Sequence, residues 1–408
     1  MAEVTKARKD EGRTLVICPK SIMQAAWAED LEKFTPELSY SLAYAHNRAE
    51  AFFAKTDIVI TNHDAVAWIE KTISKRTPIL NNFCQLIIDE STAYKNNSQR
   101  STALTKIKDF FKYRTIMTGT IYSNSLTDIW RQLFIVDDGQ RLGNSFYKFR
   151  AQVCESRQLG NGISVWTDRE GMEPVIFHLI NNISTRRTLE SCIDIPENTT
   201  QTLSVTLNEK HRKLYKQLEE DALLQINNRQ ITAINAAVLA NKLLQIASGA
   251  VYDANGEYQL LDTDRYELVR DLAEARPQSI IAFHWRHQKE QLLKLLPHAR
   301  VIDGTITQEQ RDHAINDFQL GLIPQLLIHP KSGAHGLTLT AGYATIWASP
   351  TYSAEQFVQF NRRIYRAGQT KKTETLLIQA KNTLEEKAYA KLTGKLTNMQ
   401  NILDLFTL

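Results

Sequence analysis

The chain has 408 residues, of which 43% are hydrophobic and 23% charged, a composition that excludes a disordered or fibrous protein. Its length predicts two or three domains. The formal net charge of +4 is too small to identify a partner, and no apolar run is long enough to cross a bilayer. The 4 cysteines are widely spread, which favours reduced thiols in a cytosolic compartment over a disulfide framework or a zinc site.

Short apolar runs in the first half of the chain end in polar residues, which is the pattern of buried parallel strands. These runs cover residues 15–18, 57–60, 86–88 and 115–117. Residues 1–12 predict a helix before the first run, and Trp27 and Leu31 have helical spacing after it. We therefore predict a doubly wound α/β domain, with helices between parallel strands.

The second half of the chain repeats this pattern. Its apolar runs cover residues 279–283, 300–303, 325–329, 344–348 and 375–378. Between the halves, residues 195–198 read as a linker, and residues 208–247 carry a helical apolar pattern. The predicted organisation is a first lobe at 1–196 with an irregular insertion at about 142–187, and a second lobe at 197–408 with a helical protrusion at about 208–248.

Polar residues follow two of the predicted strands, at the position where open α/β sheets bind their ligands. Asp89 and Glu90 follow the third run, and one carboxylate can hold Mg²⁺ while its neighbour polarises an attacking water. Thr118, Gly119 and Thr120 follow the fourth run, and small residues with hydroxyls allow close approach to a phosphate. Taken alone, each motif is better explained as a turn at a strand end.

The segment from Gln359 to Gln369 is the most informative part of the sequence. If it is helical, Arg363 and Arg366 are three residues apart and project from one face. Two guanidinium groups on one face suit a γ-phosphate and the charge that develops on it during hydrolysis. The alternative is a solvated charged face, which Gln359 one turn earlier and the closing Gly368–Gln369 disfavour.

This segment resembles the last helicase motif of the Swi/Snf family of DNA translocases, in helicase superfamily two, of phage or bacterial type. Further segments resemble the other motifs of the family, in the family's order. They are residues 18–21 (CPKS), 61–63 (TNH), 89–92 (DEST), 118–120 (TGT) and 330–339 (PKSGAHGLTL). The resemblance extends over nearly the whole chain.

The resemblance implies an α/β fold of two RecA-like parallel-sheet lobes with helical insertions, ATP and Mg²⁺ as cofactors, and double-stranded DNA, rather than RNA, as partner. Asp89 would position Mg²⁺, Glu90 would activate water, and Arg363 and Arg366 would reach the ATP from the second lobe. The resemblance implies further roles for nucleotide binding (Gly336, Gln359), for coupling (Thr118, Gly119, Thr120) and for contacts to the DNA backbone (Lys20, Thr61, Asn62, Gly304, Thr305, Ser332, Gly333).

The sequence departs from the family at the Gly-rich phosphate loop, which should carry Gly-Lys-Thr or Gly-Lys-Ser ahead of residue 18. The sole Gly-Lys pair is Gly394–Lys395, and Leu396 follows it. The first lobe is therefore expected to be N-terminally incomplete, as a fragment, as a chain completed by a separate protein, or as a variant that has lost the loop. A smaller departure is Ile121, where the family generally has Pro.

Two hypotheses of function follow. One is an ATP-dependent translocase that remodels DNA or protein–DNA complexes in the cytoplasm of a bacterial or phage-infected cell. The other is a truncated or degenerate member that binds nucleic acid without hydrolysing ATP. A metal hydrolase using His284 and His287 lacks a third ligand. An aromatic cluster is expected to pack as core rather than to stack on bases: Phe146, Tyr147, Phe149, Trp166 and Phe177.

Overall fold

The computed structural model describes residues 5–6, 8–119, 121–122, 125–160, 163–187, 189–227, 233–333 and 337–394. The chain divides into two compact units, Met1–Gln158 with Ser164–Thr185, and Leu159–Ile163 with Arg186–Leu408. The sequence predicts the division at residue 196. In the structure α9 (Leu189–Cys192) is part of the second unit, where Arg362 Nη1 donates to Glu190 Oε1 at 3.0 Å.

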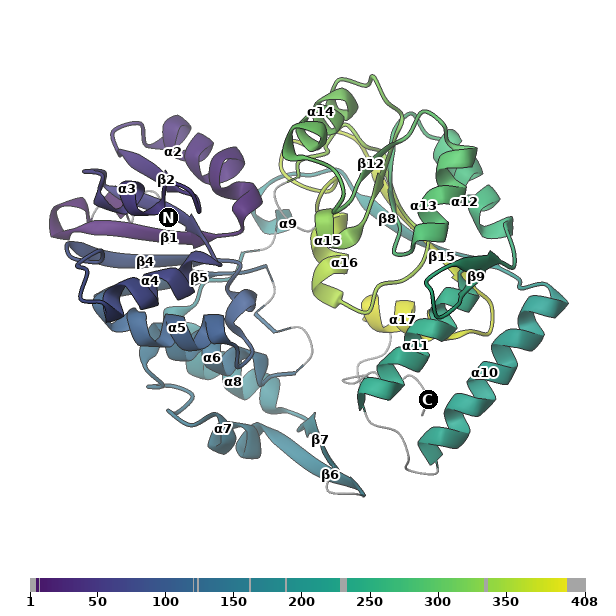
Figure 1. The fold of residues 1–408 in the computed structure, drawn as a ribbon, viewed down its shortest axis with the longest axis horizontal. Helices are drawn as coiled ribbons and strands as arrows, with labels where there is room; N and C mark the ends of the chain where they lie inside the picture. The colour runs from purple at the N-terminus through teal and green to yellow at the C-terminus, as the bar shows by residue number, and fades with distance from the viewer. Residues whose placement is uncertain are drawn as a thin grey trace. The chain divides into compact units, whose positions relative to one another are not determined.

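The first unit is built on a five-stranded parallel sheet in the order β2-β3-β1-β4-β5 (Figure 1). Its strands are β1 (Arg13–Cys18), β2 (Tyr40–Ala43), β3 (Ile58–Asn62), β4 (Phe83–Asp89) and β5 (Tyr113–Met117). The sequence predicts four of them, but not β2, whose sequence YSLA is interrupted by the polar Ser41 and shows no continuous apolar run.

Helices connect the strands of the first sheet. They are η1 (Lys9–Glu11), η2 (Lys20–Ile22), the π-helix η3 (Met23–Ala28), α2 (Glu29–Phe34), α3 (Arg48–Phe53), α4 (Ala65–Ser74), η4 (Ser91–Tyr94), α5 (Gln99–Ile107), η5 (Lys108–Phe110) and α6 (Asp128–Asp137). The helix expected over residues 1–12 is limited, within the described residues, to helical backbone at 5–6 and the single turn η1. Gly12 ends this turn at φ 149°, where an added Cβ would lie 2.7 Å from the carbonyl oxygen of Asn82.

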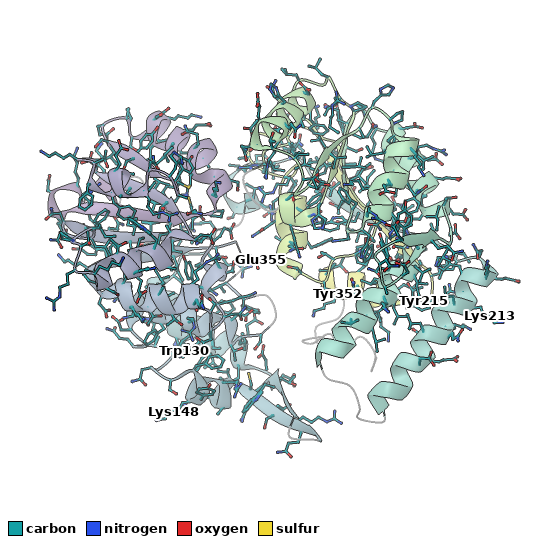
Figure 2. All side chains as sticks on the ribbon, viewed as in Figure 1. Trp130, Lys148, Lys213, Tyr215, Tyr352 and Glu355 are labelled. Atoms are coloured by element: carbon teal, nitrogen blue, oxygen red, sulfur yellow. The ribbon has the colours of Figure 1, made fainter. Side chains whose placement is uncertain are left out.

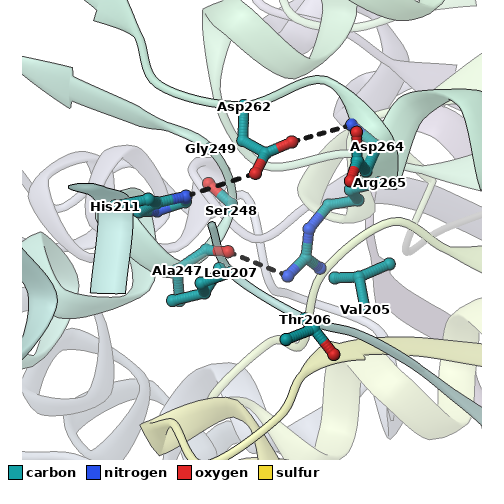
Figure 3. Close-up of a pocket in the computed structure, with 10 residues that line it drawn as sticks. All are labelled: Val205, Thr206, Leu207, His211, Ala247, Ser248, Gly249, Asp262, Asp264 and Arg265. Carbon is teal, nitrogen blue, oxygen red and sulfur yellow. Dashed lines mark hydrogen bonds and ion pairs between the residues drawn. The ribbon is translucent and has the colours of Figure 1, made fainter. Parts of the chain in front are cut away.

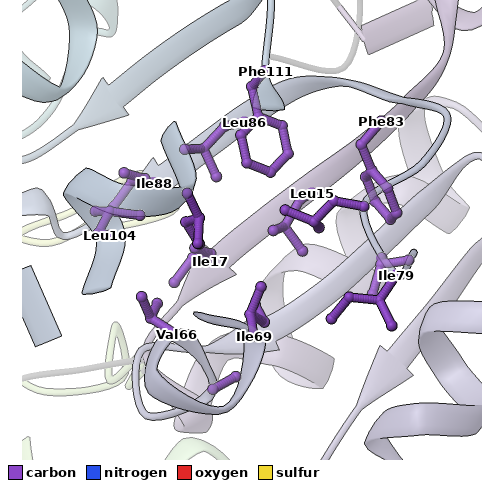
Figure 4. Close-up of a cluster of buried hydrophobic side chains, with 14 of the residues drawn as sticks. Leu15, Ile17, Val66, Ile69, Ile79, Phe83, Leu86, Ile88, Leu104 and Phe111 are labelled. Carbon is purple, nitrogen blue, oxygen red and sulfur yellow. The ribbon is translucent and has the colours of Figure 1, made fainter. Parts of the chain in front are cut away.

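Both faces of the first sheet are buried. On one face Leu15 and Ile17 of β1 pack with residues of α4 and α5, as the cluster in Figure 4 shows. On the other face Val16 and Cys18 pack with side chains from η3 and α2. Alternate residues of a strand point to opposite faces, so burial on both sides explains why β1 reads as a continuous apolar run.

The insertion expected at about 142–187 has regular structure in the described residues. It contains α7 (Phe146–Val153), a two-stranded sheet of β6 (Cys154–Gly160) and β7 (Ile163–Asp168), α8 (Met172–Ile180) and η6 (Asn181–Ile183). Phe149 is buried in the same hydrophobic cluster as Trp130, which Figure 2 labels, and Phe146, Trp166 and Phe177 pack against that cluster, as expected. The prediction is wrong for Tyr147, which is 73% exposed.

The second unit is built on a six-stranded sheet in the order β12-β13-β11-β14-β15-β8. Its strands are β8 (Asn198–Val205), β11 (Ser279–Ala282), β12 (Arg300–Ile302), β13 (Gln325–Ile328), β14 (Ala344–Trp347) and β15 (Thr373–Ala380), with β9 (Ala250–Tyr252) and β10 (Tyr258–Leu260) forming a separate pair. The strands of the six-stranded sheet pair in parallel throughout its described residues. The fold class predicted from the sequence, two parallel α/β sheets, is confirmed.

Helices surround this second sheet. They are α10 (Glu209–Asn227), α11 (Ala233–Ala247), α12 (Asp264–Glu274), α13 (Arg286–Leu295), α14 (Gln308–Gln319), α15 (Pro330–Gly333), α16 (Ala354–Asn361) and α17 (Leu384–Leu392). The pair α10 and α11 corresponds to the predicted helical protrusion, and Figure 1 shows both helices beside α17. They enclose a cluster of their own, which includes Tyr215, Leu243 and Leu384.

Strand β8 was not predicted, because its Thr- and Gln-rich sequence contains no apolar run. It pairs in parallel with β15 over its whole length, from Asn198 opposite Thr373 to Val205 opposite Ala380. The side chain of Asn198 adds a hydrogen bond of 2.9 Å from the Thr373 hydroxyl. Part of the expected linker at 195–198 therefore starts the edge strand of the second sheet.

Candidate functional site

Four adjacent strands of the first unit deliver the predicted polar residues to one edge of the sheet. Because β3, β1, β4 and β5 are parallel neighbours, their carboxyl ends lie side by side. Cys18 at the end of β1 is in register with Asn62, and Asp89 at the end of β4 is in register with Met117. The first-unit candidates that the structure describes therefore share one sheet edge. Thr120 lies outside the described residues.

Asp89 is held in place by two hydrogen bonds, one to each carboxylate oxygen. The indole N–H of Trp27 donates to Oδ2 and the backbone N–H of Glu90 donates to Oδ1, both at 3.0 Å. Burial raises the pKa of Asp89, and these two hydrogen bonds oppose that rise. A single fixed carboxylate with free lone pairs fits a Mg²⁺ ion, which proteins bind through one or two carboxylates together with substrate phosphates and water.

Glu90 occupies an unusual backbone conformation. Its φ of 53° and ψ of 56° are left-handed, a region that costs a non-glycine residue about 1–2 kcal/mol. It caps the short helix η4, in which the Ala93 N–H donates to the Glu90 carbonyl at 3.1 Å. This turn is fixed by Tyr94, whose buried hydroxyl lies 3.0 Å from Nδ1 of His63.

The residues expected to contact a nucleic-acid backbone differ in accessibility. Lys20 is exposed at the start of η2, and Asn62 is half-buried. The hydroxyl of Thr61 is buried and donates to the Ala43 carbonyl at 2.9 Å, so it ties β3 to β2. At the end of β3 the half-buried side chain of Asn62 lies near Arg48, with Nη2 of Arg48 3.4 Å from Oδ1 of Asn62.

A residue that the sequence analysis missed joins the two motifs after β4 and β5. Gln132 on α6 is fully buried, and its Oε1 accepts a 2.6 Å hydrogen bond from the Ser91 hydroxyl. Its Nε2 donates to the Ile121 carbonyl at 2.7 Å and to the Asp128 carbonyl at 2.9 Å. Nothing in the local sequence distinguishes Gln132 from a solvated helix residue.

In the second unit, the expectation of a helix through Arg363 and Arg366 is wrong. Helix α16 ends at Asn361 and Arg362 caps it, so both arginines lie in the turns that follow. The two guanidinium groups nevertheless converge: Nη1 of Arg363 and Nη1 of Arg366 both donate to the Leu337 carbonyl, at 3.3 and 2.9 Å. From the sequence, a helix face was the expected reason for the two guanidinium groups to lie on one side. In the structure, a shared acceptor brings them together.

A buried glutamine holds these turns. Nε2 of Gln369 lies within 3.3 Å of the carbonyl oxygens of Thr340, Gly342 and Ile364. Its side chain is 5% exposed, so the closing Gly-Gln of the motif is a structural cross-link. Gln359 lies earlier, on α16, with Nε2 3.4 Å from Glu355 Oε1.

The other candidates of the second unit follow two neighbouring strands, β12 and β13. Gly304 and Thr305 are exposed, and the Thr305 hydroxyl donates to Asp303 Oδ1 at 2.6 Å. Ser332 and Gly333 lie in α15, which begins directly after β13. Gly333 is buried, and an added Cβ would lie 2.8 Å from Ile328 Cγ2 and 3.1 Å from the Phe360 ring. Gly336 lies outside the described residues.

Two family models match the chain. The model of the SNF2-related domain matches residues 1–249, which is more than half of the chain, and the model of the helicase conserved C-terminal domain matches residues 264–368. The chain belongs to the SNF2-related family. The two matched segments contain the first-unit strand ends and the Leu337–Arg366 cluster, respectively.

Similar relatives of this SNF2-related chain come from phage, bacteria and animals. Protein p41 of Acyrthosiphon pisum secondary endosymbiont phage 1 is 28% identical, over 91% of this chain and 84% of p41. An uncharacterized ATP-dependent helicase of Mycoplasma pneumoniae is 27% identical over 92% of this chain. Chromodomain-helicase-DNA-binding protein 1-like of Mus musculus is 23% identical over 96% of it. This chain spans only 35% and 44% of the length of the last two.

The metal-hydrolase alternative finds no support in the SNF2-related fold. His287 uses both ring nitrogens, with Nε2 3.0 Å from the Ser248 hydroxyl and Nδ1 2.8 Å from the Tyr252 hydroxyl. The ring of His284 packs near His329, with centroids 6.0 Å apart. The described ranges contain no group of three or more His, Cys, Asp or Glu residues that could hold a metal ion.

A small pocket in the second unit is formed by structural polar groups (Figure 3). His211 is buried in its wall, near Asp262 (Nδ1 to Oδ2 3.8 Å), and burial lowers its pKa. Arg265 donates across the pocket to the Ala247 carbonyl at 3.0 Å. These polar groups bond to one another and to backbone carbonyls. Their contacts hold α10, α11 and α12 together around the pocket.

The structure also bears on the cysteines of the SNF2-related chain and on the absence of membrane-spanning helices from its described part. Cys18, Cys84 and Cys154 are buried free thiols and Cys192 is an exposed one, as expected for reduced cysteines. Among the helices of the described part of the chain, none has the length and apolar character needed to span a membrane.

Proposed function

We propose that this chain is the motor part of an ATP-dependent translocase that moves on double-stranded DNA. The observation that carries the proposal is the match of both SNF2-related and helicase C-terminal models to a chain whose two parallel sheets each present motif residues at their carboxyl ends. The names of the relatives, an ATP-dependent helicase and a helicase-DNA-binding protein, agree with it.

In the first unit, Asp89 would hold Mg²⁺ and Glu90 would orient the attacking water. The hydrogen bonds from Trp27 and from the Glu90 N–H fix the Asp89 carboxylate before any ligand binds, which reduces the reorganisation needed for catalysis. Bound Mg²⁺ would neutralise charge on the β- and γ-phosphates. The left-handed backbone of Glu90 sets the direction in which its carboxylate leaves the strand end.

In the second unit, Arg363 and Arg366 would stabilise the charge that develops on the γ-phosphate. Their shared acceptor, the Leu337 carbonyl, keeps both guanidinium groups in one small region, and a planar guanidinium matches the geometry of phosphate oxygens. Gln359, and Gly336 outside the described residues, are proposed to contact the nucleotide.

Contacts to the DNA backbone are proposed for residues of both units. Exposed Lys20, Gly304 and Thr305, and half-buried Asn62 and Ser332, lie at strand ends where backbone and side-chain donors can reach phosphate. Thr61 and Gly333 are buried, so any contribution from them would come through backbone groups. Such contacts read no base sequence, which suits a motor that steps along a duplex.

Turnover of ATP by the purified chain, with and without duplex DNA, tests the proposal. We expect duplex to stimulate turnover, and Glu90→Gln to lower it at least about 100-fold while leaving duplex binding intact. Arg366→Lys should lower turnover by about 10³-fold, because an arginine at a γ-phosphate contributes that much. Duplex binding with no turnover above the Glu90→Gln level would instead support the alternative, a family member that binds nucleic acid without hydrolysing ATP.

A further inference from the structure

Gln132 lies on α6, outside every motif of the sequence, yet it contacts the segments that carry two of them. Its carboxamide oxygen accepts from the Ser91 hydroxyl at 2.6 Å, and Ser91 is the residue after Glu90. Its amide nitrogen donates to the Ile121 carbonyl at 2.7 Å, three residues after Thr118. A single buried side chain thus spans the loops that follow β4 and β5.

The chemistry of the carboxamide fixes its orientation. The oxygen is an acceptor only and the NH₂ group is a donor only, so a flipped Gln132 would lose both bonds to the carbonyls of Ile121 and Asp128, and the Ser91 hydroxyl would have to accept instead of donate. Both Gln132 and Ser91 are 0% exposed, so water does not replace a lost bond. The two loops therefore keep their positions relative to α6 only as long as the whole network is formed.

A second contact links the same elements. Nζ of Lys95, just after η4, lies 3.6 Å from Oδ2 of Asp128 in the first turn of α6, and both side chains are mostly buried. Helix α6 packs against both η4 and β5. The first turn of α6 thus bridges the two loops, with Gln132 as its buried contact.

An apolar side chain of the same size would be the simpler way to fill this space. Burying a polar network costs free energy unless every member is satisfied, and a leucine would avoid that cost. A hydrogen-bonded network at this place fixes the positions of the two loops relative to each other, in addition to filling the space between them. That property matters where two loops must move together.

We propose that Gln132 is a positioning residue that couples the carboxylate loop, residues 89–95, to the described residues after β5, 118–119 and 121–122. This inference rests on the proposed function, since it assigns to Gln132 the transmission of changes at Asp89 and Glu90 to the Thr118–Gly119 segment. Gln132 touches neither nucleotide nor DNA in this role. It acts by holding Ser91 and Ile121 at a fixed separation.

Hydrogen–deuterium exchange on the full chain tests the coupling without any need for turnover. The variants are Ser91→Ala, Gln132→Leu and the two combined, with Gln152→Leu on the exposed surface of α7 as the matched control. We expect Ser91→Ala to raise exchange about fivefold in the distant 113–122 peptide, the effect of losing one hydrogen bond. In the Gln132→Leu background Ser91→Ala should add nothing there. The proposal would be overturned if Ser91→Ala raised exchange only in its own turn. It would also be overturned if the increases in exchange of the two single variants simply added in the double variant.

Turnover of the double variant separates positioning from packing. Replacing Ser91 as well as Gln132 removes the unpaired serine hydroxyl but leaves the Ile121 carbonyl without its donor, so the melting temperature should recover part of the loss seen in Gln132→Leu. We expect stimulation by duplex DNA to stay at least about tenfold reduced even so, a loss in the range of known positioning errors. If stimulation returns together with stability, Gln132 is a packing residue and the proposal fails. If the unmodified chain shows no turnover at all, the proposed function fails, and the exchange experiment still decides the role of Gln132.

Discussion

The indole N–H of Trp27 donates a 3.0 Å hydrogen bond to Oδ2 of Asp89, although 62 residues separate them in the sequence. Trp27 lies in the π-helix η3, the first connection out of β1, and Asp89 ends the neighbouring strand β4. The bond thus joins the segment after the first motif to the carboxylate of the Asp-Glu pair. A phenylalanine at position 27 would fill much of the same space without a donor.

Asp89→Asn should gain stability relative to the unmodified protein as the pH rises. Burial raises the folded-state pKa of Asp89 above the ordinary value of 3.8, so the folded state binds more protons and loses stability as the pH rises from 3.8 through the raised pKa. Asparagine does not titrate and avoids this loss. Melting temperatures between about pH 3.5 and 7 check this. Parallel curves for Asp89→Asn and the unmodified protein would contradict it.

Gly333→Ala should destabilise the protein and Gly304→Ala should leave its stability almost unchanged, although both glycines are proposed to lie near DNA. An added Cβ at Gly333 would lie 2.8 Å from Ile328 Cγ2 and 3.1 Å from the Phe360 ring, whereas nothing lies within 4 Å at Gly304. We expect Gly333→Ala to cost about 1–3 kcal/mol of unfolding free energy through overpacking. Gly304→Ala should stay within about 0.5 kcal/mol. Thermal unfolding of both variants measures the difference, and equal melting temperatures would refute the packing role of Gly333.

Arg265→Met should strongly destabilise the second unit. The buried guanidinium donates to the carbonyls of Ala348 at 2.7 Å and Ala247 at 3.0 Å, and to Glu385 Oε2 at 2.6 Å. Its removal leaves the carboxylate of Glu385 buried without its ion-pair partner, which costs about 3–5 kcal/mol. Urea unfolding should show this loss. Combining Arg265→Met with Glu385→Gln should recover part of it, because the amide oxygen can still accept from the Ala380 N–H.

The matched control for this prediction lies on the same helix. Arg270 on α12 forms an ion pair with its sequence neighbour Asp271, and the two side chains are 32% and 62% exposed. Arg270→Met should therefore change the unfolding free energy by less than about 1 kcal/mol, as for other exposed ion pairs. A loss as large as that of Arg265→Met would show that the effect comes from helix α12 in general.

The second unit should lose stability in mild acid. Burial lowers the pKa values of His284 and His287 to about 3, below the ordinary 6.5, so both stay neutral in the folded state. The unfolded chain binds more protons between about pH 6.5 and 3, and stability falls as the pH drops through that window. His284→Phe should flatten the fall with little cost at pH 7, because Nε2 of His284 has no hydrogen-bond partner in the described structure.

The sequence predicted those strands whose burial makes them apolar throughout. Strand β4 is buried on both faces and reads as an apolar run, whereas β8 lies at a sheet edge with a Thr-rich sequence and was read in part as a linker. Its place in the sheet comes from pairing with β15, 175 residues away along the chain at the Thr373–Asn198 bond. Such partners are not visible in a local pattern.

The site residues also divide into those that a local sequence pattern predicts and those that depend on distant partners. Asp89 and Glu90 were predicted because they follow a strand, and the structure puts them at its end. The helix through Arg363 was wrong because tertiary hydrogen bonds outweigh helix propensity there: the Leu339 N–H donates to the Arg363 carbonyl at 2.9 Å, and Gln369 holds the turns that follow. Trp27 and Gln132 act through long-range contacts and were missed. The roles of the site residues, and the expected incompleteness of the first lobe, stay predictions.

The left-handed backbone at Glu90 has a consequence for laboratory evolution. Glycine or asparagine suits this conformation better than glutamate, by up to about 1–2 kcal/mol. A library selected only for resistance to heat should therefore accumulate those residues at position 90, and a library selected for work on DNA should reject them. The frequency of glutamate at this one position would then report which of the two demands a given screen imposes.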